Sequence, residues 1–361
     1  MDIDKIQEIA ESAWNEPKTH QFPPEVKNRM LHADADVFSY KACDLDYTYA
    51  QNVQTLKELI QVWRKLAGAE FVKLHLTMGN KGGREEIAKV KKYQGNRSKQ
   101  DHDKQERVAD LREWMMNITP GKERMLPFAN FDQEADDSMT QAMHESLKDG
   151  RDDVLFTVDK DLWMVPGKHL NPKTLEIDEY PDNYGRCYLT VDGRGKKKLV
   201  GMGTSWFWHQ MLMGDQADNV PGLPMMTKGM WIKHAPTKAI ADVNRRLASG
   251  RHPSGSLMTT EQRRKYTAKY SELYEQAQDK KIGQVLAHKY LENCLSDHMA
   301  YKMVREAYED WYGSGEYSFY SWDNTLIQTD AFGMMLEQGR LLWMRRTIGE
   351  DVMTWWKSLE S

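Results

Sequence analysis

The chain has 361 residues, a net charge of −4 and a hydrophobic share of 40%. This size and composition predict a packed globular protein of one large or two medium domains, and the net charge alone does not indicate a nucleic-acid binder. Three widely spaced cysteines argue against a disulfide framework, and we find no signal peptide and no apolar run of membrane-spanning length. The sequence therefore predicts a cytoplasmic protein.

Apolar residues in the first half of the chain follow the patterns of alternating helices and strands. Residues 3–14 predict an amphipathic helix, 29–33 and 71–77 predict strands, and 53–66 predict a helix between them. A further strand is expected at 154–158. This order predicts an α/β fold with a mostly parallel central sheet flanked by helices.

The second half of the chain differs in pattern. Residues 188–191 and 196–200 flank a Gly-containing turn and predict a β-hairpin. From about residue 205 the spacing becomes helical, with many Trp, Met and Tyr residues, which we interpret as helical core packing. We therefore expect one region over 1–204 and a helical region over 205–361.

Carboxylates gather in four short clusters, and two of these clusters follow predicted strands. Their members are Asp34 and Asp36; Glu134, Asp136 and Asp137; Asp159 and Asp161; and Asp215 and Asp218. Each cluster alone has a simple explanation, as acids in a first helical turn or as a solvated turn. Together they predict a site for two hard divalent ions, Mg²⁺ or Mn²⁺, because ligands of parallel sheets gather at the carboxyl ends of the strands. Paired ions of this kind cleave phosphodiesters.

A basic segment lies between the first two clusters. Residues 81–99 contain seven Lys or Arg against two Glu. The segment is either a solvated helix face or a phosphate-binding surface.

The motifs in this order resemble the flap endonuclease and 5′–3′ exonuclease superfamily, and most closely its stand-alone phage members. The resemblance covers roughly residues 29–230. It rests on Asp34-x-Asp36, on Tyr93-x-x-x-Arg97, on Glu134-Ala-Asp136-Asp137, on Asp159-x-Asp161, and on Gly214-Asp215-x-x-Asp218-Asn219-Val220-Pro221-Gly222.

The resemblance implies a PIN-like nuclease core, a helical arch over about 80–110, and a helix–three-turn–helix element over about 214–247. It implies that one metal ion is held by Asp34, Glu134, Asp136 and Asp137, with Asp36 nearby, and the other by Asp159, Asp161, Asp215 and Asp218. It also implies a K⁺ ion in the loop after Asp218, although the second glycine pair of the family loop is missing here.

The arch residues implied by the resemblance would contact nucleic acid. Arg97 would bind a phosphate and Tyr93 would stack on an unpaired base. Gln94 stands where the family has a lysine, so Lys92 or Lys91 is expected to substitute, and Asn80 replaces a family aspartate. Further DNA contacts are expected from Arg84, Lys91, Gln94 and Lys228.

The function implied is a divalent-metal-dependent 5′–3′ exonuclease and flap endonuclease that leaves 5′-phosphates. Its substrates would be DNA with a 5′ flap, a nick, a free 5′ end or an RNA-primed end, and its setting phage replication beside a polymerase or single-strand-binding protein, with no membrane partner. Two alternatives stay open: a PIN-like ribonuclease, and a weakened DNA-binding replication protein on the same fold.

Overall fold

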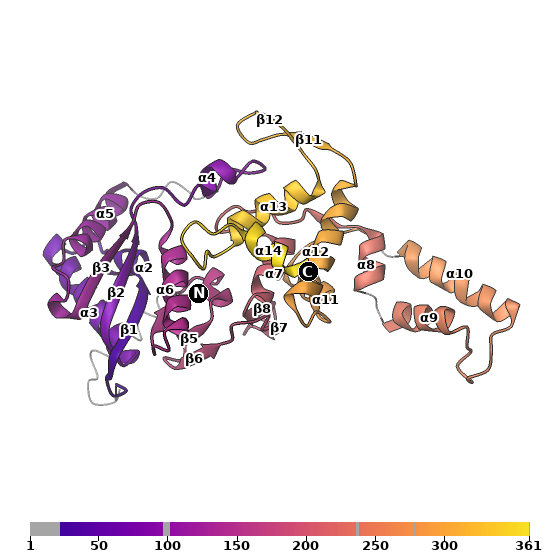
Figure 1. The fold of residues 1–361 in the computed structure, drawn as a ribbon, viewed down its shortest axis with the longest axis horizontal. Helices are drawn as coiled ribbons and strands as arrows, with labels where there is room; N and C mark the ends of the chain where they lie inside the picture. Colours follow the sequence, from indigo (N-terminus) through magenta and orange to yellow (C-terminus); the bar gives the residue numbers. More distant parts are fainter. Residues whose placement is uncertain (1–21, 97–101, 236–237, 277–278, 361) are drawn as a thin grey trace.

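The computed structural model describes residues 22–96, 102–235, 238–276 and 279–360. Its first half contains a six-stranded sheet in the order β3-β2-β1-β4-β5-β6 (Figure 1). Five strands are parallel, and β6 pairs antiparallel at one edge. The strands are β1 (Val26–Asp34), β2 (Ala69–Thr77), β3 (Met125–Asn130), β4 (Val154–Phe156), β5 (Gly167–Leu170) and β6 (Ile177–Tyr180). The predicted mostly parallel α/β fold is confirmed.

Helices cover both faces of this sheet. Alternate residues of β1 point to opposite sides: Leu31 and Ala33 pack under α2, α3 and α5, whereas His32 faces α6. The helices of the first half are α2 (Ala35–Ala42), α3 (Tyr49–Leu66), α4 (Arg84–Ile87), α5 (His102–Met116) and α6 (Ala135–Lys148), with 3₁₀ turns at Lys122–Arg124 and Asp161–Met164. Thr48 and Gln51 form a capping box that fixes the start of α3.

The expected arch segment divides into two parts. α5 buries Val108, Leu111 and Met115 in the core beneath the sheet, so this part is a covering helix rather than a free-standing arch. Residues 84–96 run instead toward the C-terminal half. The predicted N-terminal helix over 3–14 lies outside the described residues.

The predicted hairpin is also confirmed, and the chain after residue 205 is mostly helical. β7 (Arg186–Val191) pairs with β8 (Lys197–Met202). Two further strand pairs are β9 (Met225–Met226) with β10 (Lys280–Lys281), and β11 (Tyr317–Tyr320) with β12 (Leu326–Thr329). The helices are α7 (Ser205–Met213), α8 (Lys228–His234), α9 (Lys238–Ser249), α10 (Thr260–Gln276), α11 (Gln284–Leu291), α12 (Asp297–Tyr312), α13 (Ala331–Leu342) and α14 (Val352–Leu359).

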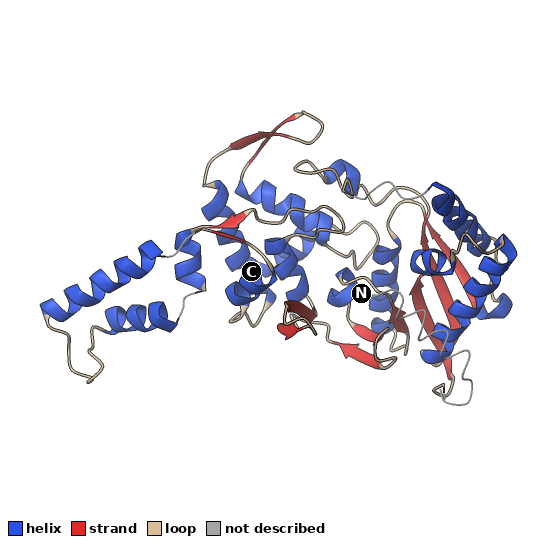
Figure 2. Ribbon diagram, turned by 180° about the vertical axis from the view of Figure 1, so that it is seen from behind, coloured by secondary structure: helices blue, strands red, loops and turns tan. Residues whose placement is uncertain are grey.

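Aromatic residues fill the core of this second half. Trp208, Trp343 and Trp356 are buried, and Phe207 packs edge-on against the first two of these indoles. The core interpretation therefore holds for these residues, whereas Trp322 lies on the surface. α9 and α10 project away from the body as a helical pair (Figure 2). Within the described residues, no helix is both long and apolar enough to cross a bilayer.

Candidate metal centre

The carboxyl ends of two neighbouring parallel strands bring the first acids together. Ala33 of β1 lies beside Phe156 of β4, so Asp34 and Asp159 follow their strands at the same edge of the sheet. One oxygen of Asp34 accepts hydrogen bonds from the backbone N–H groups of Asp36 and Val37 and caps α2. Asp34 thus has a structural role as an N-cap and keeps its other oxygen for a ligand.

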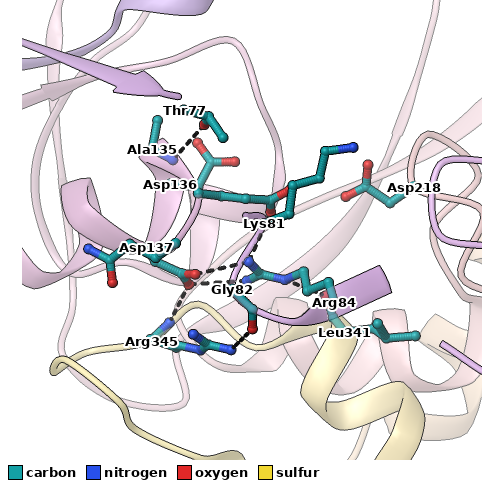
Figure 3. Close-up of polar contacts among 12 residues, drawn as sticks. Thr77, Lys81, Gly82, Arg84, Ala135, Asp136, Asp137, Asp218, Leu341 and Arg345 are labelled. Carbon is teal, nitrogen blue, oxygen red and sulfur yellow. Dashed lines mark hydrogen bonds and ion pairs between the residues drawn. The ribbon is translucent and has the colours of Figure 1, made fainter. Parts of the chain in front are cut away.

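The start of α6 adds the second cluster. Glu134 occupies the N-cap position but makes no capping hydrogen bond, and Asp136 lies in the first turn. Thr77 at the end of β2 accepts a hydrogen bond from the backbone of Ala135, at 2.9 Å, which fixes the start of α6 against the same edge of the sheet. Asp136 thereby comes under the influence of the charges of Asp159 and Asp34, and Figure 3 shows its carboxylate beside Thr77.

Gln210 joins the two remaining clusters. Its amide nitrogen donates to Asp161, at 2.6 Å, and to Asp215, at 3.4 Å. Asp161 in turn donates its backbone N–H to the carboxylate of Asp159. Nothing in the sequence pattern singled out Gln210, because a glutamine inside an apolar helix carries no motif.

A tight loop sets the positions of Asp215 and Asp218. Gly214 has φ of +71°, and a side chain there would meet the carbonyl oxygen of Val220 at 2.3 Å. One oxygen of Asp215 accepts from the backbone of Ala217 and Asp218. The glycine is therefore required by the close approach of the two ends of the loop.

The acids strongly perturb one another. Burial, with repulsion from Asp36 and Asp159, raises the pKa of Asp34 to about 7. Burial and the charges of Asp159 and Asp34 raise the pKa of Asp136 well above its usual value, and burial with Asp159 and Asp215 does the same for Asp161. Such crowding costs free energy unless protons or cations compensate it.

The donor set fits hard divalent cations in its chemistry. All the clustered groups are carboxylates, and among the described residues no ion pair joins a Lys or Arg to the cluster's uncompensated members, which are Asp34, Asp136, Asp159, Asp161 and Asp215. Within the same residues, no three Asp, Glu, His or Cys side chains lie close enough to hold one ion directly. Ligation through water would relax that spacing, and Mg²⁺ commonly retains several waters.

Asp137 lies apart from these acids. Its two oxygens accept hydrogen bonds from Arg84, at 2.9 and 3.1 Å, and from the backbone of Arg345 at 3.0 Å. Figure 3 shows Asp137 turned away from Asp136 and toward these partners. Metal ligation by Asp137 stays a prediction that this arrangement does not favour.

Arg84 is fully buried, an arrangement that does not favour the predicted DNA contact by this residue. Besides Asp137, it pairs with Glu134 at 2.9 Å and donates to the carbonyl of Trp343. Burial raises the pKa of Glu134 to about 7, although Arg84 acts in the opposite direction. The number of Lys and Arg residues over 81–99 could not distinguish a buried arginine from exposed ones.

Tyr93 and Gln94 contact the acids rather than solvent. The Tyr93 hydroxyl donates to Asp218 at 2.9 Å and lies 3.2 Å from Glu134, while the ring is buried. Gln94 donates to the other oxygen of Asp218 and accepts from Lys81. In this conformation Tyr93 cannot stack on a base as predicted, and Gln94 faces the site.

The remaining predicted residues have varied surroundings. Lys91 and Lys92 are exposed, and Arg112 pairs with Asp36 at 2.9 Å. Lys228 donates its backbone N–H to Asp279, which leaves its predicted DNA contact untested. Arg97 lies outside the described residues. K⁺ binding in the loop after Asp218 stays a prediction.

A buried polar chain behind the site was not anticipated. His32 Nδ1 and His75 Nε2 are 3.0 Å apart, His75 Nδ1 lies 2.6 Å from the Ser138 hydroxyl, and His32 approaches Asp153 at 3.4 Å. These side-chain contacts link β1 and β2 to α6, and so they help to position the elements that carry Asp34 and Asp136. The alternation of β1 and β2 placed both histidines on one face, which is the only signal the sequence offered.

No protein family and no curated protein sequence matches this chain. Solved structures that are similar include the flap endonuclease of bacteriophage T5 crystallised with metal ions, at 13% identity and a TM-score of 0.38, covering 78% of this chain and 98% of that one. A complex of the same phage enzyme with DNA and metal ions has 15% identity and a TM-score of 0.39, covering 78% and 92%. The phage T5 5′-exonuclease with bound zinc has 15% identity and a TM-score of 0.38, covering 78% and 93%. These similarities are too low to carry a function to this chain.

Proposed function

We propose that the chain is a divalent-metal-dependent nuclease that cleaves DNA at 5′ ends and at 5′ flaps. The observation that carries the proposal is the convergence of mutually repelling carboxylates from four chain segments at the carboxyl edge of a parallel sheet. Their oxygen-only chemistry suits Mg²⁺ or Mn²⁺. The sequence motifs resemble those of the flap endonuclease and 5′–3′ exonuclease superfamily.

The residues divide into two groups by the acids that they face. Asp34 and Asp136 would hold one cation and share Asp159 with a second, which Asp161, Asp215 and Asp218 would complete. When bound, such cations lower the pKa of water and neutralise charge on phosphate oxygens.

The protein's own groups position this site. Gln210 orients Asp161 and Asp215, and Asp34 is oriented by the amides of α2. Tyr93 and Gln94 would leave Asp218 when a substrate enters, since both now occupy its oxygens. Exposed Lys91 and Lys92 directly precede Tyr93 on the same segment and would bind the backbone of the incoming strand.

The product would keep a 5′-phosphate, and the proposed setting is phage DNA replication, beside a polymerase or a single-strand-binding protein. These details rest on the resemblance of the sequence motifs.

The test is digestion of 5′- and 3′-labelled flap, nicked and RNA-primed duplexes with Mg²⁺, Mn²⁺ or EDTA. We expect metal-dependent products that shorten from the 5′ end, no cutting by Asp161→Asn, and normal cutting by Asp132→Asn. Asp132 is an exposed acid near the start of α6, so its variant controls for loss of one negative charge. Binding without cutting in any metal would refute the proposal, and preferential digestion of single-stranded RNA would favour the ribonuclease alternative.

A further inference from the structure

The β11–β12 hairpin presents aromatic side chains to solvent. Tyr317 and Phe319 on its inner face pack against the C-terminal core, whereas Tyr320 on the outer face is 71% exposed and its cross-strand partner Leu326 is 53% exposed. Trp322, in the turn between the strands, is 45% exposed. The fold therefore leaves two large rings available that core packing does not use.

The tip of this hairpin is held against the segment that leads to the acids. The Trp322 backbone N–H donates to the carbonyl of Lys89 at 3.1 Å, and its indole N–H donates to the carbonyl of Ala88 at 2.9 Å. The Lys92 ammonium lies 5.5 Å from the centre of the Trp322 ring. Figures 1 and 2 both show the hairpin at the same edge of the molecule as α4.

The charges beside these rings suit a phosphate backbone. Lys91 and Lys92 are exposed, and Lys89 is half-buried next to them. Two carboxylates in this region are engaged locally: Asp323 accepts from Ser321 and Thr325 within the turn, and Glu337 accepts the backbone N–H groups of Lys89 and Val90. Exposed rings bordered by lysines are the combination that binds single strands without sequence preference.

The position of the rings relative to the acids gives them a role. Tyr93 directly follows Lys92, and its hydroxyl bonds to Asp218. Two adjacent residues of one segment, Lys92 and Tyr93, therefore contact Trp322 and the acids respectively.

We propose that Tyr320, Trp322, Lys91 and Lys92 form a stacking platform for the unpaired bases of a 5′ DNA flap. The rings would stack on bases and the lysines would hold the intervening phosphates. The identity of the strand rests on the proposed function, whereas the platform itself rests on exposure and charge.

Binding without cleavage tests the platform most directly. In EDTA at low ionic strength, Tyr320→Ala is expected to weaken binding of a duplex with a long 5′ flap by about fivefold to thirtyfold, and to leave binding of a nicked duplex unchanged. Tyr320→Phe keeps the ring and should bind like the wild type. Tyr188→Ala removes an exposed tyrosine from the β7–β8 hairpin, on another side of the molecule, and should have no effect.

An abasic flap separates stacking from charge. It keeps the phosphates and lacks the bases, so wild-type affinity should fall at least as far as Tyr320→Ala lowers it on the normal flap. Wild type and Tyr320→Ala should then bind the abasic flap equally, because neither ring has a base to stack on. Equal binding of normal and abasic flaps by the wild type, or full affinity of Tyr320→Ala, would overturn the platform. Digestion with Mg²⁺ is measured separately: base-dependent binding without any cutting would sustain the platform while refuting the nuclease, and cutting without base dependence would do the reverse.

Discussion

Two adjacent residues of α6 show two ways of placing a carboxylate inside a protein. Asp137 is buried against Arg84, and both of its oxygens accept hydrogen bonds. Asp136 instead experiences the charges of Asp159 and Asp34, and among the described residues no Lys or Arg forms an ion pair with it. One position is complete without any ligand, and the other has an excess of negative charge.

This difference separates the acid that is paired within the protein from the acids that would serve the proposed function. A buried charge paired within the chain contributes to the fold, because separating it from its partner would leave the partner uncompensated. A cluster of unpaired carboxylates lowers stability and persists only where something outside the chain compensates it. The Arg84 group therefore anchors the C-terminal half to α6, while the acid cluster is available for cations.

The largest effect is expected from a substitution that removes the negative charge of Asp136. Asp136→Asn should reduce metal-dependent cutting by about a thousandfold, because a neutral amide binds a hard cation poorly. The same change removes repulsion from Asp34 and Asp159, so the metal-free variant should melt at the wild-type temperature or above it. Cleavage rates measure the loss of activity, and melting curves measure the stability. A variant that lost both activity and stability would show that Asp136 is structural.

The next largest effect is expected from removing the partner of the paired acid, Asp137. Arg84→Met should lower the free energy of unfolding by about 3 kcal/mol or more, since it leaves Asp137 buried and unpaired. Adding Asp137→Leu should restore part of the loss by removing the stranded charge. Denaturant titrations of the single and double variants measure this. An Arg84→Met protein as stable as the wild type would mean that the ion pair does not hold these elements together.

Removing the metal tests whether the clustered acids bind the cation. Mg²⁺ at a hundredfold excess over its dissociation constant should stabilise the wild type by about 2.7 kcal/mol relative to EDTA. Asp136→Asn should lose most of this increment, whereas the exposed-acid control Asp132→Asn should keep it. Thermal melts in EDTA and across a Mg²⁺ series measure the increment, and equal metal responses of the two variants would place the cation elsewhere.

The sequence predicted the main elements and most of the acids because each left a local pattern. β1 and β2 follow period-two or continuous apolar runs, and Asp34 comes directly after one of them. Parallel neighbours then place Asp34 and Asp159 at one edge without further information. β3 was not predicted, because its sequence, MLPFAN, contains a proline and is only partly buried at the sheet edge.

Contacts between distant segments left no such pattern. In the sequence Arg84 looks like one more cation of a basic segment, yet it is buried by partners from α6 and by carbonyls at the C-terminal end of α13. Tyr93 reads as a stacking ring, yet it bonds to Asp218, which lies 125 residues away. Nothing local distinguished Trp322 from the buried tryptophans. In each case tertiary partners decided the role.

The smallest expected effect concerns a third way of burying a titratable group, by keeping it neutral. His169 is buried, donates to the carbonyl of Val165 and stacks on Tyr180 at 4.0 Å, and burial lowers its pKa to about 4. A histidine with a lowered folded pKa stabilises fully above its unfolded pKa of about 6.5 and loses that stability as pH falls toward the folded value. Between pH 7 and pH 5 this linkage should remove about 2 kcal/mol.

The clustered acids act with the opposite sign, because a raised folded pKa makes them less destabilising as pH falls. The free energy of unfolding of the wild type therefore contains both the histidine contribution and the acid contribution. The measurement must compare His169→Gln with the wild type at each pH. The variant should be less stable at pH 7, and the gap should narrow by about 2 kcal/mol at pH 5. A gap that stayed constant across this window would show that His169 does not resist protonation, and it would leave the contrast between Asp136 and Asp137 unaffected.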